Sequence, residues 1–169
     1  MLAAQVQIQT SLTEYRESNK EKSPNELKKE PHHPTTVLSR NLTAIGEPKP
    51  STIHDPHHIV MGTGRFRKMQ MMLARLNLHV FGIGINDPIN GVWLPRTKAD
   101  KGHWASPLAP AHKEIHRYNY ETWITSLLSN DSLPESVYVN RLRSIKNKLK
   151  TGTYPTQIIE KKTLEWKGE

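Results

Sequence analysis

Apolar residues recur at helical spacing in four segments of this chain, and this pattern limits what the chain can fold into. The four helical segments are residues 37–46, 64–78, 110–128 and 134–150. Residues 58–61 and 92–95 instead have the β-branched and aromatic character of short strands. We therefore expect an α+β fold that is mostly helical and contains two short strands.

Composition predicts one modest domain with flanking segments. Only 35% of the 169 residues are apolar, and the mean hydropathy is -0.68. Residues 13–36 are charged and contain prolines but few large apolar side chains, which is typical of a disordered tail or linker. The expected organisation is a tail over residues 1–36, a folded domain over 37–150 and an extension of unknown structure over 151–169. The absence of cysteine excludes disulfide bonds and cysteine-ligated zinc.

The charge distribution predicts a polyanionic partner. The net charge is +8, and residues 51–169 carry seventeen Lys and Arg against ten Asp and Glu. A positive surface favours nucleic acid first and an anionic membrane surface second, although basic residues also serve solubility alone. Because no apolar run reaches about 18 residues, we expect no membrane insertion. The first residues lack the basic and continuous apolar regions of a Sec-type signal.

Histidines occur at two positions that matter for chemistry. His57 and His58 are adjacent, just before the pair Ile59-Val60, and His112 and His116 are four residues apart. On a helix, two imidazoles at this spacing share a face and can reach one metal ion. The alternative is that all four are hydrogen-bonded core histidines. A zincin protease is excluded because that motif needs Glu directly after the first His, where this chain has Lys113.

Four motifs occur in an order that resembles a known nuclease family. The motifs are "LSRNLTAIGEPKP", "HHIV", "GINDPINGVWLP" and "AHKEIHRYNY". Together they resemble the AHH family of the HNH/endonuclease VII superfamily over about residues 37–130. The resemblance implies a ββα-metal (His-Me finger) core with flanking helices. One residue departs from the pattern, because Pro56 precedes the His pair where relatives have Ala or Gly, and it stiffens the approach to His57.

The resemblance also implies a role for each site residue. His57 would bind a divalent ion together with His112 and His116, and His58 would act as the general base. Asn90 would bridge the two strands and orient His58 within the catalytic machinery. The ion would be Mg²⁺, Mn²⁺ or Zn²⁺, and three imidazoles suit zinc or nickel. The remaining upstream and downstream histidines, His54 and His103, are open as ligands, phosphate contacts or neither, and His32-His33 is not expected to bind metal.

The expected function is a metal-dependent endonuclease that hydrolyses DNA phosphodiester bonds with little sequence specificity, with RNA as the other possible substrate. The products would carry 5′-phosphate and 3′-hydroxyl ends. Six basic residues are expected to hold the nucleic-acid backbone without reading sequence: Arg96, Lys98, Lys101, Arg141, Arg143 and Lys146.

AHH domains are often found in bacterial polymorphic toxins and secreted interbacterial effectors. The resemblance therefore implies a bacterial toxin delivered without a Sec signal, which acts in the cytoplasm of a target cell and is paired with an acidic immunity protein. Two other functions stay open on the residues alone. One is a non-catalytic nucleic-acid-binding module whose structural metal takes a fourth ligand, and the other is a helical interaction protein without metal.

Overall fold

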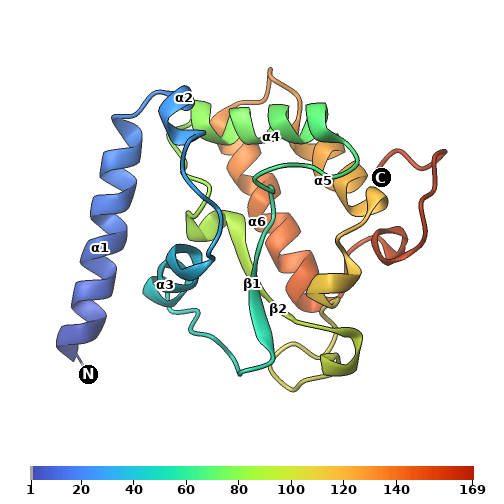
Figure 1. Cartoon of the computed structure of the whole chain (residues 1–169), viewed down its shortest axis with the longest axis horizontal. Coiled ribbons are helices and arrows are strands. Elements are labelled where there is room, and N and C mark those ends of the chain that lie inside the picture. The colour runs from blue at the N-terminus through green and yellow to red at the C-terminus, as the bar shows by residue number, and fades with distance from the viewer. Residues whose placement is uncertain (1) are drawn as a thin grey trace.

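The computed structural model describes residues 2–169 and has an α+β fold, about half of it helical (Figure 1). The α-helices and strands follow one another in the order α1 Leu2–Lys20, α2 Pro24–Leu27, α3 Thr36–Ala44, β1 His54–His58, α4 Lys68–Val80, β2 Gly91–Pro95, α5 Tyr118–Leu128 and α6 Glu135–Thr151. The predicted fold class is confirmed at this level. The ββα-metal core that the resemblance implies stays a prediction. None of the helices in the described part of the chain is long and apolar enough to span a membrane.

The two strands form one antiparallel sheet in which His57 lies opposite Val92 and His58 lies opposite Gly91. Directly opposed residues share a face, so adjacent residues of β1 point to opposite faces. Val92 belongs to the main core, which α5 and α6 line, whereas a Cβ on Gly91 would meet Leu38 of α3. The sheet therefore separates His57 from His58 by face.

Pro56 fits into β1 without loss of a ladder hydrogen bond. The amide of Ile59 donates to Asn90 and that of Arg96 to Ile53, both at 2.8 Å, so the odd-numbered residues of this segment are the hydrogen-bonded pairs. An amide at position 56 would point away from β2, and proline has none to lose.

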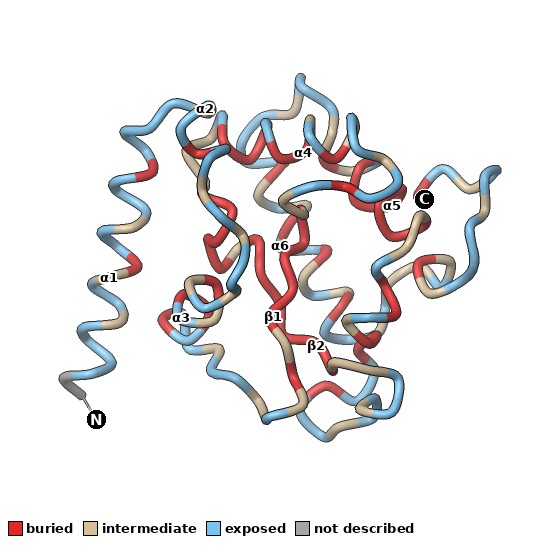
Figure 2. Tube along the Cα trace, in the orientation of Figure 1, coloured by how far each residue is buried: buried red, intermediate tan, exposed pale blue. Residues whose placement is uncertain are grey.

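Helices α4, α5 and α6 pack around the sheet and enclose the main core (Figures 1 and 2). Figure 2 shows both strands buried along most of their length. A smaller apolar cluster joins Trp93 to Leu38 and Leu42 of α3. The prediction of α3 and α6 is confirmed almost to the residue.

Helix α4 begins four residues later than the 64–78 pattern predicts. The amides of Arg65, Phe66 and Arg67 donate to the carboxylate of Glu121 at 2.7, 2.9 and 2.6 Å, so this turn wraps an anion instead of joining the helix. The sequence of this helix contains two apolar stripes. The stripe with Met71, Ala74 and Leu78 is buried, whereas most of the other stripe is exposed: Phe66, Met69, Met72 and Leu76.

The single helix expected over residues 110–128 is divided. A short 3₁₀ turn covers His112–Glu114, and α5 begins only at Tyr118. The break has two anchors, because the Lys113 amide donates to the carbonyl of Arg96 at 3.2 Å and the Arg117 amide to that of Ile115 at 2.8 Å. His112 and His116 are therefore not one turn apart on one helix.

Helices α1 and α2 lie within the segment for which a disordered tail is expected from the sequence. Polar side chains hold this segment to the domain: Arg16 Nε lies 2.8 Å from Asp87, and Asn86 Nδ2 donates to Glu30 at 2.8 Å. Leu12 and Leu27 are buried. Polar contacts to distant residues hold this segment in place, although its composition provides no large apolar face. The segment after α6 also packs on the domain, through Ile158 in the main core.

Candidate metal centre

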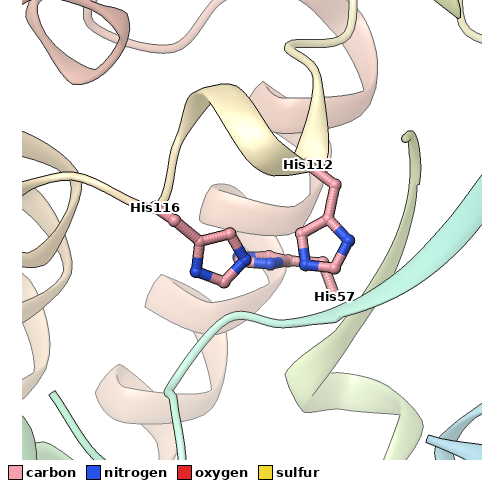
Figure 3. A group of neighbouring side chains, drawn as sticks. All are labelled: His57, His112 and His116. Carbon is pink, nitrogen blue, oxygen red and sulfur yellow. The ribbon is translucent and has the colours of Figure 1, made fainter. Parts of the chain in front are cut away.

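Three histidines from two parts of the chain converge at the end of β1. His57 comes from the strand, and His112 and His116 come from the 3₁₀ turn and the loop after it (Figure 3). One ring nitrogen from each lies within 4.8 Å of the other two. The structure thus brings together the three predicted ligands, by a turn rather than by the helix that was expected. In the described part of the chain they form the one such group of histidines and acids.

Tyr120, together with the carbonyl of Ile59, favours one tautomer of His57. The Tyr120 hydroxyl lies 2.8 Å from His57 Nε2 and donates its own proton to the carbonyl of Ile59 at 3.1 Å. Its oxygen is thus left to accept from Nε2–H of His57. A neutral His57 then has its lone pair on Nδ1, in the form that binds a metal ion.

The three rings are held in the neutral state that metal binding requires. Burial, followed by the neighbouring His112 and His116, lowers the pKa of His57 well below its usual value. Burial and then His116 lower the pKa of His112 to about 4. The pKa of His116 is also lowered, by burial and then by Arg65. At neutral pH all three rings therefore offer lone pairs.

His58 lies beside this group, in the same pocket. The pocket has a volume of about 230 Å³, and six of the nine histidines line it: His32, His33, His57, His58, His112 and His116. His58 Nε2 lies 2.9 Å from Oδ1 of Asn86. Burial lowers the pKa of His58 to about 4, so the ring is neutral and able to accept a proton at pH 7.

The side chain of Asn90 makes its hydrogen bonds to the main chain on either side of it. Its amide group accepts from the Val60 amide at 2.7 Å and donates to the carbonyls of Val60 and Ile85 at 3.1 and 2.9 Å. The side chain is fully buried and bridges the end of β1 to the turn before β2, as predicted, but it does not contact His58. The contact to His58 belongs to Asn86, four residues earlier.

The family is decided by a sequence profile, described as a nuclease family of the HNH/ENDO VII superfamily with conserved AHH, which matches residues 38–161. The chain belongs to the AHH family. Searches of curated proteins and of solved structures found no match. Within the AHH signature, Pro56 stands where the family has Ala, and His57 and His58 are the two histidines. The match extends eleven residues beyond the domain end expected at residue 150.

Arg65 adds a positive charge to the AHH pocket that the sequence analysis did not single out. It lines the pocket with an exposed side chain, on the turn whose amides bind Glu121. Glu121 also lines the pocket, yet its carboxylate is taken up by three amide donors. Arg65 is therefore the exposed cation of this wall, whereas the carboxylate of Glu121 is buried and bound to the turn.

The six residues predicted to contact the nucleic-acid backbone are not equally free to bind phosphate. Arg96 makes a two-bond ion pair with Asp55, at 2.9 and 3.0 Å, and Asp55 also lies 3.9 Å from Nδ1 of His112. Lys98 and Lys101 lie 3.6 and 3.1 Å from the carboxylate of Glu114. Lys98 remains 69% exposed, which makes it the most accessible of these three cations.

The three predicted contacts on α6 also differ. Lys146 is held inside the protein, 2.9 Å from Glu47 and 3.1 Å from the carbonyl of Pro88, and its contact with nucleic acid stays a prediction. Arg141 donates to the last turn of α5 through the carbonyl of Leu127 at 2.6 Å. Arg143 is exposed, and its guanidinium contacts only Asn140 at 3.4 Å.

His54 and His103 form a separate pair outside the metal centre, with ring centroids 4.9 Å apart. Both nitrogens of His54 are occupied, by Ser51 and Ser106 at 2.8 Å each. Neither ring lines the pocket with the three ligands. The fourth ligand required by a structural metal is therefore not supplied by these two residues.

Sequence reasoning missed Asn86, Tyr120 as the partner of His57, and the pair His32-His33. Asn86 lies in the motif "GINDPING", whose other asparagine, Asn90, carries the Asn-Gly turn signal. Tyr120 falls four residues after His116, and that spacing was the available signal. His32-His33 carried no usable signal, because its position depends on helices α1 and α2.

Proposed function

We propose that this AHH protein is a metal-dependent endonuclease that hydrolyses DNA phosphodiester bonds with little sequence preference. The observation that carries the proposal is the combination of His57, His112 and His116 with a neutral His58 in one pocket. The chain belongs to a nuclease family, which supports phosphodiesters as the substrate class.

The donor set fits a divalent ion. Three neutral imidazoles suit zinc or nickel by ligand softness, and Mg²⁺ or Mn²⁺ would require oxygen ligands from water and substrate in addition. His57, His112 and His116 would hold the ion. When bound, the ion supplies positive charge that stabilises the negative charge developing on the phosphate and on the leaving oxygen.

His58 would accept the proton of the attacking water. The water oxygen forms a bond to phosphorus while the bond from phosphorus to the 3′ oxygen breaks, and the proton moves to Nδ1 of His58. The leaving 3′ oxygen takes a proton from solvent water. The products are a 5′-phosphate and a 3′-hydroxyl. Arg65 at the pocket wall and Lys98 outside it would bind neighbouring phosphates, which carry no sequence information.

DNA cleavage by the purified protein tests the proposal. Supercoiled plasmid and a structured RNA are incubated with Mg²⁺, Mn²⁺, Zn²⁺ or Ni²⁺, and with EDTA. We expect DNA cleavage that EDTA stops, loss of metal binding in His57→Ala, and a metal-loaded but inactive His58→Ala. His103→Ala is the matched control, because it removes a histidine outside the pocket. A folded, metal-loaded protein that cuts neither substrate would refute the nuclease mechanism.

We further propose that the protein acts as an antibacterial toxin in the cytoplasm of a target cell, with an acidic immunity protein as its inhibitor. The resemblance to toxin domains and the net charge of +8 support this role. Cytoplasmic expression in a test bacterium should arrest growth and degrade the chromosome, and His58→Ala should be harmless at equal protein level. Normal growth with active wild-type enzyme would contradict the toxin role while leaving the nuclease intact.

A further inference from the structure

Glu30, which lies ahead of the AHH-matched region, forms the centre of a partly buried hydrogen-bond network. Its Oε1 accepts from Asn86 Nδ2 at 2.8 Å, and its Oε2 accepts from the Ile85 amide at 3.1 Å. The hydroxyl of Tyr15 on α1 donates to the same carboxylate at 2.9 Å. The second proton of Asn86 Nδ2 goes to the carbonyl of Pro31 at 3.0 Å.

These contacts leave the Asn86 side chain one orientation. Both partners of Nδ2 are acceptors only, so the nitrogen must face residues 30–31 and Oδ1 must face His58. An amide oxygen has no proton to give. Nε2 of His58 therefore carries the ring proton, and Nδ1 carries the lone pair.

We propose that Glu30, acting through Asn86, selects the Nε2–H tautomer of His58 and is a positioning residue of the active site. The inference rests on the proposed function, because His58 is the group proposed as the base. It assigns a role in the chemistry to the segment ahead of the AHH-matched region.

The segment that carries Glu30 is fixed in place from a second side. Arg75 of α4 donates to the carbonyls of Lys28 and Glu30 at 2.9 and 3.2 Å, and to that of Gly62 at the pocket wall at 2.8 Å. Figure 1 shows the segment between α2 and α3 running beside β1. It brings His32 to 6.0 Å from His58 between ring centroids. Tyr15 and Arg75 thus hold the carboxylate of Glu30 against Asn86.

The test combines nitrogen NMR of the histidine rings with turnover, both on the full chain. Long-range ¹H–¹⁵N correlations report directly which ring nitrogen is protonated. We expect wild-type His58 to show the Nε2–H form, and Glu30→Ala to show a mixture of tautomers. The kcat of Glu30→Ala should fall about tenfold or more, with KM and metal affinity unchanged within about twofold. Glu21→Ala, an exposed acid of the same segment, is the matched control.

A conservative variant separates positioning from bulk stability. Glu30→Gln keeps one carbonyl oxygen to accept from Asn86, so it should restore the Nε2–H form and most of kcat. Wild-type tautomer and kcat in Glu30→Ala would overturn the proposal. If Glu30→Ala does not fold, Asn86→Ala breaks the same link, and an unchanged tautomer and kcat there overturns it equally. Because the NMR readout needs no substrate, it decides the inference even if the wild type cleaves nothing.

Discussion

Oη of Tyr120 lies 2.8 Å from Nε2 of His57, in a core where both side chains are almost fully buried. The hydroxyl donates a hydrogen bond to the carbonyl of Ile59, which leaves the hydroxyl oxygen as an acceptor. Tyr120 of α5 thereby favours the tautomer of His57 whose Nδ1 carries the lone pair for a metal ion. The metal centre and the fold are connected through this single hydroxyl.

Tyr120→Phe should weaken metal binding by about 10–100-fold, because the His57 tautomer loses its support. Competition with a chromogenic chelator measures the affinity. Tyr138→Phe is the matched control, because it also removes a buried hydroxyl, one that donates to the Ala74 carbonyl at 2.7 Å away from the site. Both variants should lose about 1 kcal/mol of stability. Equal metal affinities in the two variants would show that the Tyr120 hydroxyl is only structural.

Glu121→Gln should destabilise the pocket wall. The carboxylate accepts three amide protons, and charge-assisted bonds of this kind are worth more than neutral ones, so we expect the free energy of unfolding to fall by about 2 kcal/mol. Urea denaturation measures the loss, and proteolysis near Arg65 should accelerate. The exposed Glu165→Gln is the control for a change of charge alone. Unchanged stability would mean that the turn holds its shape without the anion.

Arg65→Ala should raise the Kd for DNA and reduce the salt dependence of binding by about one phosphate contact. Arg40→Ala removes an exposed arginine of α3 that does not line the pocket, and it should change neither quantity. Fluorescence anisotropy at several salt concentrations, with catalytically inactive His58→Ala as the background, gives both slopes. Identical slopes for the two arginine variants would exclude Arg65 from the binding surface.

The metal-free protein should lose stability on acidification. The pKa values of His58, His79 and His112 are lowered to about 4, chiefly by burial, and the unfolded chain keeps values near 6.5. The unfolded state therefore binds more protons below pH ~6.5, and stability is full above that pH and declines toward pH ~4. Each group contributes a slope of about 1.4 kcal/mol per pH unit. Urea denaturation in EDTA measures this slope.

A histidine outside the pocket provides the check on this explanation. Nε2 of His79 accepts a hydrogen bond from Arg75 Nε at 3.0 Å, and His79 does not line the pocket of the three ligands. His79→Gln should lower the slope by one group's share while leaving metal affinity unchanged. A stability that does not vary over this pH range would contradict the buried neutral state of these rings.

Much of the metal centre was predictable from the sequence, because its ligands lie in short motifs with distinctive spacing. His57, His112 and His116 come together as expected, and β2 begins one residue before the predicted range. Strand β1 lies at His54–His58 and shares only His58 with the predicted range 58–61. The helical reason given for His112 and His116 was wrong, since periodicity does not show that Lys113 and Arg117 make backbone bonds that end the helix. Spacing located the ligands even though the local structure differs.

Contacts between distant polar residues could not be predicted from the sequence. Asn86 and Glu30 are separated by 56 positions, and nothing local to either one predicts their bond. The same applies to α4, where two apolar stripes compete and the one with Met71 and Leu78 is buried. Periodicity predicts that such a helix is amphipathic, but only the packing of α2 and α5 on it decides which face is inside.

Pro56 has an effect that extends past the pocket. Its ring occupies the side of β1 that faces away from β2, where an alanine would present an amide donor. A two-stranded sheet has two outer edges, and each one can recruit a strand from another chain. At β1 the row of donors is interrupted in the middle of the strand. The same residue that stiffens the approach to His57 therefore also opposes intermolecular β-sheet extension along the edge next to His57 and His58.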